Sequence, residues 1–163
     1  MAVTTQKSTE YTNQTASPVT LNPTTSYHGR IRVASFVHDQ SGVGDAGSTV
    51  SLIRLPAGTV KVLLHSSVMY VNWTASSQTL DLGWEAYTDA DGDAVAADPD
   101  GLIDGLDVDT AGYFAMSGAL ATVKATGGTY TFTSRDGVVI AATAVGALAD
   151  GDDIAGYIQY VVD

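Results

Sequence analysis

The chain has 163 residues, 45% of them hydrophobic, with 7 basic against 18 acidic side chains and a formal net charge of −11. This length predicts one domain with a real hydrophobic core, and the negative charge disfavours partnership with nucleic acid or with anionic membranes. The sequence contains no cysteine, which excludes disulfides, thiolate nucleophiles and zinc sites of the cysteine type. We also expect neither a secretory signal in the first ten residues nor a membrane-spanning helix, because no apolar run is long enough.

Residues 1–25 differ from the rest of the chain because they are rich in Thr, Ser, Asn and Gln. Their larger apolar side chains are Val3, Tyr11, Val19 and Leu21. Such a segment buries too little surface to fold alone, so it is either a disordered tail or an extended arm that becomes ordered against a neighbouring subunit. A tail has no need of apolar groups spaced along it. We therefore expect an arm whose four apolar side chains lie at an interface.

From residue 26 to residue 163 the hydrophobic pattern has a period of two, which predicts β-strands. Runs of this kind occupy residues 30–39, 49–55, 59–65, 67–73, 79–87, 112–116, 129–135, 138–145 and 153–163. Turn signals separate them, and we expect Asp136-Gly137 to form a tight hairpin. Helical signal is scarce: residues 98–108 could form one short turn, and residues 117–125 are a second weak candidate.

This spacing of short strands predicts an all-β domain, an antiparallel β-sandwich or jelly-roll, over residues 26–163. The alternation also predicts which side chains are inside. The expected core includes Leu80, Leu82, Trp84, Ile154, Ile158 and Tyr160.

Residues that could carry catalysis are few. The chain has three histidines, His28, His38 and His65, and Ser35 lies near His38, but on a strand these two side chains would point to opposite faces. No hydrolase, phosphate-loop or dinucleotide-binding motif is present. Paired carboxylates of a glycosidase would ordinarily lie on strands lining a cleft, whereas most acids here cluster in a loop. We therefore expect no enzyme and no cofactor.

An aspartate-rich stretch, YTDADGDAVAADPDG, occupies residues 87–101. Asp89, Asp91, Asp93 and Asp100 stand at positions 1, 3, 5 and 12 of a twelve-residue calcium loop. The match is incomplete, because Ala94 replaces the glycine of position 6 and position 12 is an aspartate, shorter than the usual glutamate. We expect an Asp-Gly turn and a hydrated loop, with a Ca²⁺ or Mg²⁺ site as the alternative.

In general sequence character, three parts of the chain resemble the head decoration (cement) proteins of tailed bacteriophages. These parts are the arm up to Tyr27, residues 79–112 (TLDLGWEAYTDADGDAVAADPDGLIDGLDVDTAG) and residues 147–163 (ALADGDDIAGYIQYVVD). The resemblance implies a structural virion protein, made in the host cytoplasm, that binds the exterior of the capsid. Its partners would be the major capsid protein, bound between capsomers, and copies of itself in a homo-oligomer, expected to be a trimer. No cofactor is implied.

A carbohydrate- or receptor-binding β-sandwich module of a phage tail or head fibre is the alternative. Trp73, Trp84 and Tyr87 are aromatic side chains that could stack on a sugar. A concave aromatic platform beside the aspartate-rich loop would favour this alternative. Flat faces and a three-fold contact would favour a decoration protein.

Overall fold

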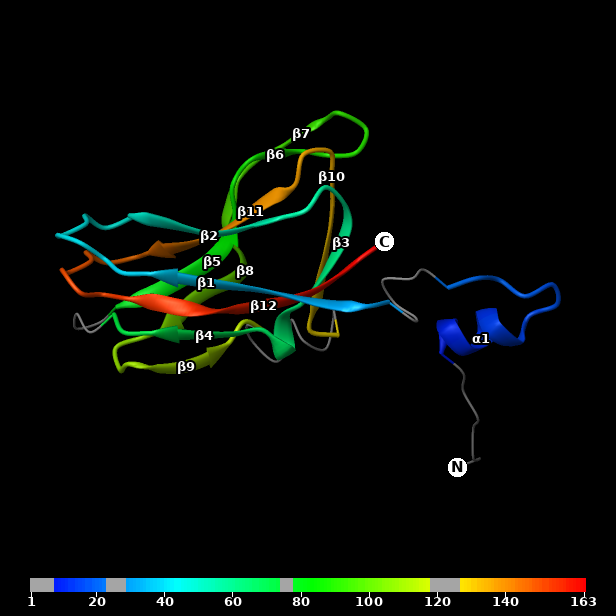
Figure 1. Ribbon diagram of the computed structural model, residues 1–163, viewed down its shortest axis with the longest axis horizontal. Helices are drawn as coiled ribbons and strands as arrows, with labels where there is room; N and C mark the ends of the chain where they lie inside the picture. Colours follow the sequence, from blue (N-terminus) through cyan, green and yellow to red (C-terminus); the bar gives the residue numbers. More distant parts are fainter. Residues whose placement is uncertain (1–7, 23–28, 74–77, 118–126) are drawn as a thin grey trace, which may run out of the picture.

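A computed structural model describes residues 8–22, 29–73, 78–117 and 127–163 (Figure 1). The elements of this part of the chain are α1 (Thr9–Thr15), β1 (Ile31–His38), β2 (Thr49–Leu55), β3 (Gly58–Leu63), the 3-10 turn η1 (Leu64–Ser66), β4 (Val68–Val71), β5 (Thr79–Trp84), β6 (Tyr87–Thr88), β7 (Ala94–Val95), β8 (Asp98–Asp107), β9 (Gly112–Ala115), β10 (Thr129–Ser134), β11 (Val138–Ala144) and β12 (Ile154–Val162). The domain is therefore all-β, as the hydrophobic pattern predicts.

Two antiparallel sheets form the sandwich. The six-stranded sheet has the order β10-β3-β12-β4-β9, in which β4 and β3 pair one after the other along the same edge of β12. The opposite edge of β12 pairs with β1 along almost its whole length. The four-stranded sheet has the order β2-β11-β5-β8. The two-residue strands β6 and β7 form a separate small hairpin that carries the aspartate-rich loop at the top of Figure 1.

A two-stranded ribbon turns from one sheet into the other. Leu55 pairs with Val138 in the four-stranded sheet, and Gly58 pairs with Ser134 in the six-stranded sheet. The expectation of a tight hairpin at Asp136-Gly137 was therefore wrong, because β10 and β11 lie in different sheets and this turn makes the crossing. Gly137 is required there, since its φ is +90° and an added Cβ would lie 2.3 Å from the Leu55 carbonyl oxygen.

The hydrophobic core lies between the two sheets. Its members include five of the six side chains expected from the alternation, namely Leu80, Leu82, Trp84, Ile154 and Ile158. Tyr160 is only half buried and packs against the margin of the core.

Residues 98–107 form a ten-residue strand, β8, so the expectation of a helical turn at this place was wrong. β8 pairs with β5, with Leu80 opposite Leu106 and Leu82 opposite Ile103. This pairing buries Leu102 and Ile103, which a single helical turn on the surface would leave in water. The other helical candidate, residues 117–125, lies outside the described residues apart from Ser117.

Within the arm, residues 9–15 are helical where we expected extended backbone. The Ser8 hydroxyl oxygen caps α1 by accepting the Tyr11 backbone N–H at 3.2 Å, and Pro18 disfavours helix just before it. Figure 1 shows α1 beyond the end of the sandwich.

Neither α1 nor η1, the helices of the described residues, is long and apolar enough to cross a membrane. The boundary at residue 25 falls outside the described residues.

Candidate interaction surface

The outer face of the six-stranded sheet gathers apolar and tyrosine side chains into rows. One row runs across four strands as Val37, Ala155, Tyr70 and Tyr113, and the next as Ser35, Tyr157, Val68 and Ala115. Ile31 and Val33 continue the same side of β1. These ten residues are called the tyrosine face below.

The tyrosine face is in contact with water. Val37 is 83% exposed and Tyr113 is 80% exposed, while Ile31, Val33 and Tyr157 are also exposed. The rings of Tyr70 and Tyr113 lie 5.1 Å apart, so two phenol groups form one contiguous aromatic surface. A contiguous apolar patch in water is unfavourable, and such patches mark interaction sites. Tyrosine is also enriched at protein interfaces.

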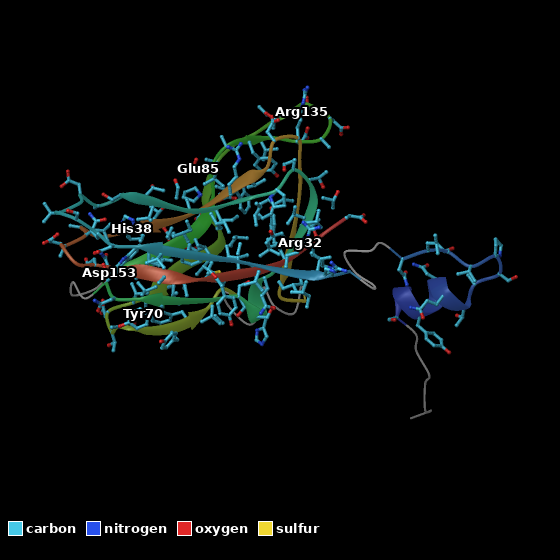
Figure 2. The ribbon with its side chains drawn as sticks, viewed as in Figure 1. Arg32, His38, Tyr70, Glu85, Arg135 and Asp153 are labelled. Atoms are coloured by element: carbon cyan, nitrogen blue, oxygen red, sulfur yellow. The ribbon has the colours of Figure 1, made fainter. Side chains whose placement is uncertain are left out.

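Charge separates this face from the rest of the domain. None of the six strands of this sheet contains an aspartate or glutamate, and their charged residues are Arg32 and Lys61. In contrast, residues 81–109 hold ten acidic side chains and no basic ones. Figure 2 shows Tyr70 and Glu85 on opposite sides of the sandwich. The molecule therefore has one neutral apolar side and one strongly acidic side.

Several acids of the acidic side accept hydrogen bonds from neighbouring strands. The Asp81 carboxylate accepts the Gly105 N–H at 2.7 Å, and Glu85 accepts a hydrogen bond from the Ser51 hydroxyl. Asp98 shares a side-chain hydrogen bond with Asp100, and this bond, partial burial and the negative charge of Asp100 raise the pKa of Asp98. These acids serve turns and strand pairs and otherwise face water.

The aspartate-rich loop is a turn stabilised by its own first carboxylate. Asp89 Oδ1 accepts the backbone N–H groups of Asp91 at 3.0 Å and Asp93 at 2.8 Å, and Gly92 takes a φ of +96° between them. Asp100 lies on β8 rather than in this turn. In the described part of the chain no three histidine or acidic side chains come together as metal ligands would. The expectation of a hydrated loop stays a prediction.

An aromatic cluster lies beside this loop. Trp84 contacts Tyr130 and Phe132, with ring centroids 4.9 and 5.4 Å apart, and Tyr87 packs edge-on to Phe132 at 6.1 Å. Burial raises the pKa of Tyr130, with smaller contributions from Tyr87 and Asp98. Trp84 and Phe132 are buried, so these rings pack mainly on one another as core and do not form an open platform for a sugar.

The histidines do not form a catalytic arrangement with Ser35. His38 Nε2 lies 3.0 Å from the Gln40 side-chain oxygen, and its strand position is on the side opposite Ser35. His65 is exposed on η1, and His28 lies outside the described residues.

The structure does not bring the predicted arm residues to the sandwich. Tyr11, Val19 and Leu21 are exposed, and Val3 lies outside the described residues. Strand alternation does not reveal the tyrosine face, because it shows which residues share a face but not which face is covered. Two signals could have found it: the absence of acids from these strands, and tyrosines at positions that alternate with the core.

No protein-family model matches the chain, and no curated protein matches it. Among solved structures, a chain of the "Cyanophage Pam1 capsid asymmetric unit" is similar with a TM-score of 0.49 and 13% identity, over 83% of this chain and 86% of that chain. A chain of the capsid of Helicobacter pylori bacteriophage KHP30 gives 0.40 and 18%, over 81% and 87%. The infectious bursal disease virus Gt strain gives 0.44 and 11%, over 82% of this chain but only 32% of that chain. These neighbours are phage and viral capsid structures, and at such low scores and identities the likenesses assign no family, site or partner.

Proposed function

We propose that the chain is a structural virion protein that decorates the exterior of a capsid and stabilises it by binding between capsomers. One observation carries the proposal: the acid-free tyrosine face lies opposite a strongly acidic side. A protein that coats a shell needs one side that binds the shell and another that stays in water. The sequence resemblance to decoration proteins points to the same role.

The tyrosine face would contact the major capsid protein. A stable interface buries roughly 800 Å² on each partner, and a sheet of six short strands offers a surface of that order. Its exposed tyrosines supply aromatic contact area with a polar hydroxyl at the end, which suits an interface that forms from two soluble proteins. The acidic side, facing outward, would keep decorated particles apart through like-charge repulsion.

The test is rebinding to heads from which the protein has been stripped. We expect the purified chain to rebind, and Tyr113→Asp and Val37→Asp each to weaken binding at least tenfold, because each places a charge in the buried contact. Val43 is the matched control, since this loop valine is 86% exposed but lies off the tyrosine face. Unchanged binding by both face variants, or equal loss in Val43→Asp, would remove the tyrosine face from the proposal.

A carbohydrate- or receptor-binding module is the second candidate function. The contiguous rings of Tyr70 and Tyr113 favour it, since aromatic rings in contact with water can stack on sugars. A glycan array with the wild-type chain and with Tyr113→Ala separates the two functions. Binding to a glycan that is lost in the variant, together with no binding to stripped heads, would favour the second.

A further inference from the structure

In the described structure no strand is hydrogen-bonded to one edge of β1, although β2 of the other sheet lies close to β1. β1 pairs with β12 through all eight residues, and within the described residues its other edge makes no backbone hydrogen bond. The strand carries no acid, and its outward side chains Ile31, Val33 and Val37 are exposed. A long, exposed, apolar edge readily pairs with another extended chain, and natural proteins usually cover or charge such an edge.

The arm presents a segment that matches this edge. Residues 17–22 run back along α1, with the Thr20 N–H donating to the Asn13 carbonyl oxygen at 3.0 Å and the Asn13 and Asn22 side chains joined at 2.8 Å. Backbone groups of alternate residues in an extended segment point to opposite sides. The edge of the segment that carries the Thr20 N–H is thus bonded to α1. On the opposite edge, the backbone groups of Val19 and Leu21 have no backbone partner among the described residues.

Charge and side-chain pattern agree with a pairing of these two edges. Residues 17–22 (SPVTLN) carry no charge, and their apolar side chains alternate, with Leu21 88% exposed. β1 is equally free of acids. Strand addition uses backbone hydrogen bonds for affinity and alternate side chains for fit, and both partners here offer both features.

We infer that residues 17–22 of one copy add as a strand to the free edge of β1 in a second copy, with Val19 and Leu21 extending the tyrosine face. Figure 1 shows the arm beyond the end of the sandwich at which β1 begins, and not alongside β1. The seven steps from Asn22 to Gly29 span at most about 25 Å, enough to reach a copy packed at that end. Because the arm and the β1 edge are different surfaces, the contact can pass from copy to copy, and a rotation that closes after three copies gives a trimer. The inference rests on the proposed homo-oligomer and not on attachment to a capsid.

Engineered disulfides test the pairing directly, because the chain has no cysteine of its own. Isotopically labelled Leu21→Cys is mixed under oxidising conditions with unlabelled Ile31→Cys, Val33→Cys or Val37→Cys, at micromolar concentration and again on particles. A disulfide requires Cα atoms within about 7 Å, so only a strand paired beside β1 cross-links efficiently. We expect a labelled–unlabelled dimer in at least one of the three mixtures. Val43→Cys is the control with an equally exposed cysteine, and it should give at least tenfold less.

A second measurement does not depend on the register. Leu21→Asp should weaken self-association at least tenfold by sedimentation, and Val43→Asp should leave it unchanged. Two results overturn the inference but leave the capsid role in place. One is an intramolecular disulfide in the Leu21→Cys/Val33→Cys double variant, and the other is no cross-link in any mixture while stripped heads are still decorated. Cross-linking between copies without capsid binding supports the inference and overturns the capsid role.

Discussion

Gln78 is a buried amide that fixes a loop and two strand ends. Its Nε2 donates to the Ala147 carbonyl oxygen at 2.9 Å, and its Oε1 accepts the Gly146 N–H at 2.8 Å. Its own carbonyl oxygen accepts the Val108 N–H at 3.1 Å. A buried polar side chain is stable only when such partners are present, and Gln78 has one for each end of its amide.

We expect Gln78→Ala to lower the free energy of unfolding by about 1–3 kcal/mol, since it leaves the Gly146 N–H and the Ala147 carbonyl group without partners. Urea unfolding followed by circular dichroism measures this. Gln14→Ala removes an exposed amide from α1 and should change the free energy by less than about 0.5 kcal/mol. Equal effects of the two substitutions would contradict the role of Gln78.

Asp98 makes stability depend on pH. Its pKa in the folded protein is raised, first by the hydrogen bond with Asp100 and then by burial. The folded state therefore binds this proton more readily than the unfolded state does. Above the raised pKa the ionised pair destabilises the fold, and this loss is recovered as the pH falls through the raised value toward the ordinary aspartate range.

We expect Asp98→Asn to be more stable than the wild type at neutral pH, because the amide can donate to Asp100 as the protonated acid does. The difference should shrink as the pH falls toward 4. Unfolding curves at both pH values measure it, and Asp100→Asn, which removes the other carboxylate, should behave in the same way. A difference that does not change with pH would show that the pair is not the cause.

At the scale of elements, β8 depends on a close contact between Gly101 and Trp84 that the hydrophobic pattern of the segment does not reveal. The Trp84 ring lies over Gly101, and an added Cβ at Gly101 would be 2.4 Å from the ring. Gly101, a poor helix former, is thus needed for packing against β5. Gly83 has a similar constraint, because its added Cβ would meet the Asp98 carbonyl oxygen.

We expect Gly101→Ala to destabilise the domain by about 1–3 kcal/mol through overpacking, and to change the fluorescence of Trp84. Gly112 on β9 is the matched control, because its added Cβ would meet nothing closer than 3.7 Å. Thermal and urea unfolding of the two variants measure the difference. If Gly112→Ala proves as costly as Gly101→Ala, the contact with Trp84 does not explain the glycine.

Alternation was sufficient to predict most strands and the inside of the sandwich, because burial of one strand face imposes a period of two. It could not predict which sheet a strand joins. Asp136-Gly137 has the sequence of a hairpin turn yet crosses between sheets, since pairing with Leu55 and Gly58 is decided by distant residues. The candidate surface was missed for the same reason: whether Tyr113 faces a neighbour or water depends on the sheet around it.

At the scale of the whole molecule, the contact that we infer between copies uses a part of the chain that lies outside the core. The core lies between the sheets, whereas Tyr11, Val19 and Leu21 are exposed in the arm. Removing the arm should therefore cost the isolated domain little. Binding between copies, however, stabilises the folded state by mass action, so that stabilisation grows with protein concentration.

We expect deletion of residues 2–24 to leave the Tm unchanged in dilute solution. As concentration rises, the Tm of the full chain should climb and that of the truncated chain should not, because only the full chain can add its arm to β1 of a second copy. Leu82→Ala, in the core, should instead lower the free energy of unfolding by about 2–5 kcal/mol at every concentration. Calorimetry over a hundredfold range of concentration separates the two behaviours. A Tm that rises equally in both chains would place the contact between copies on the sandwich itself, and the tyrosine face would then be the surface to vary.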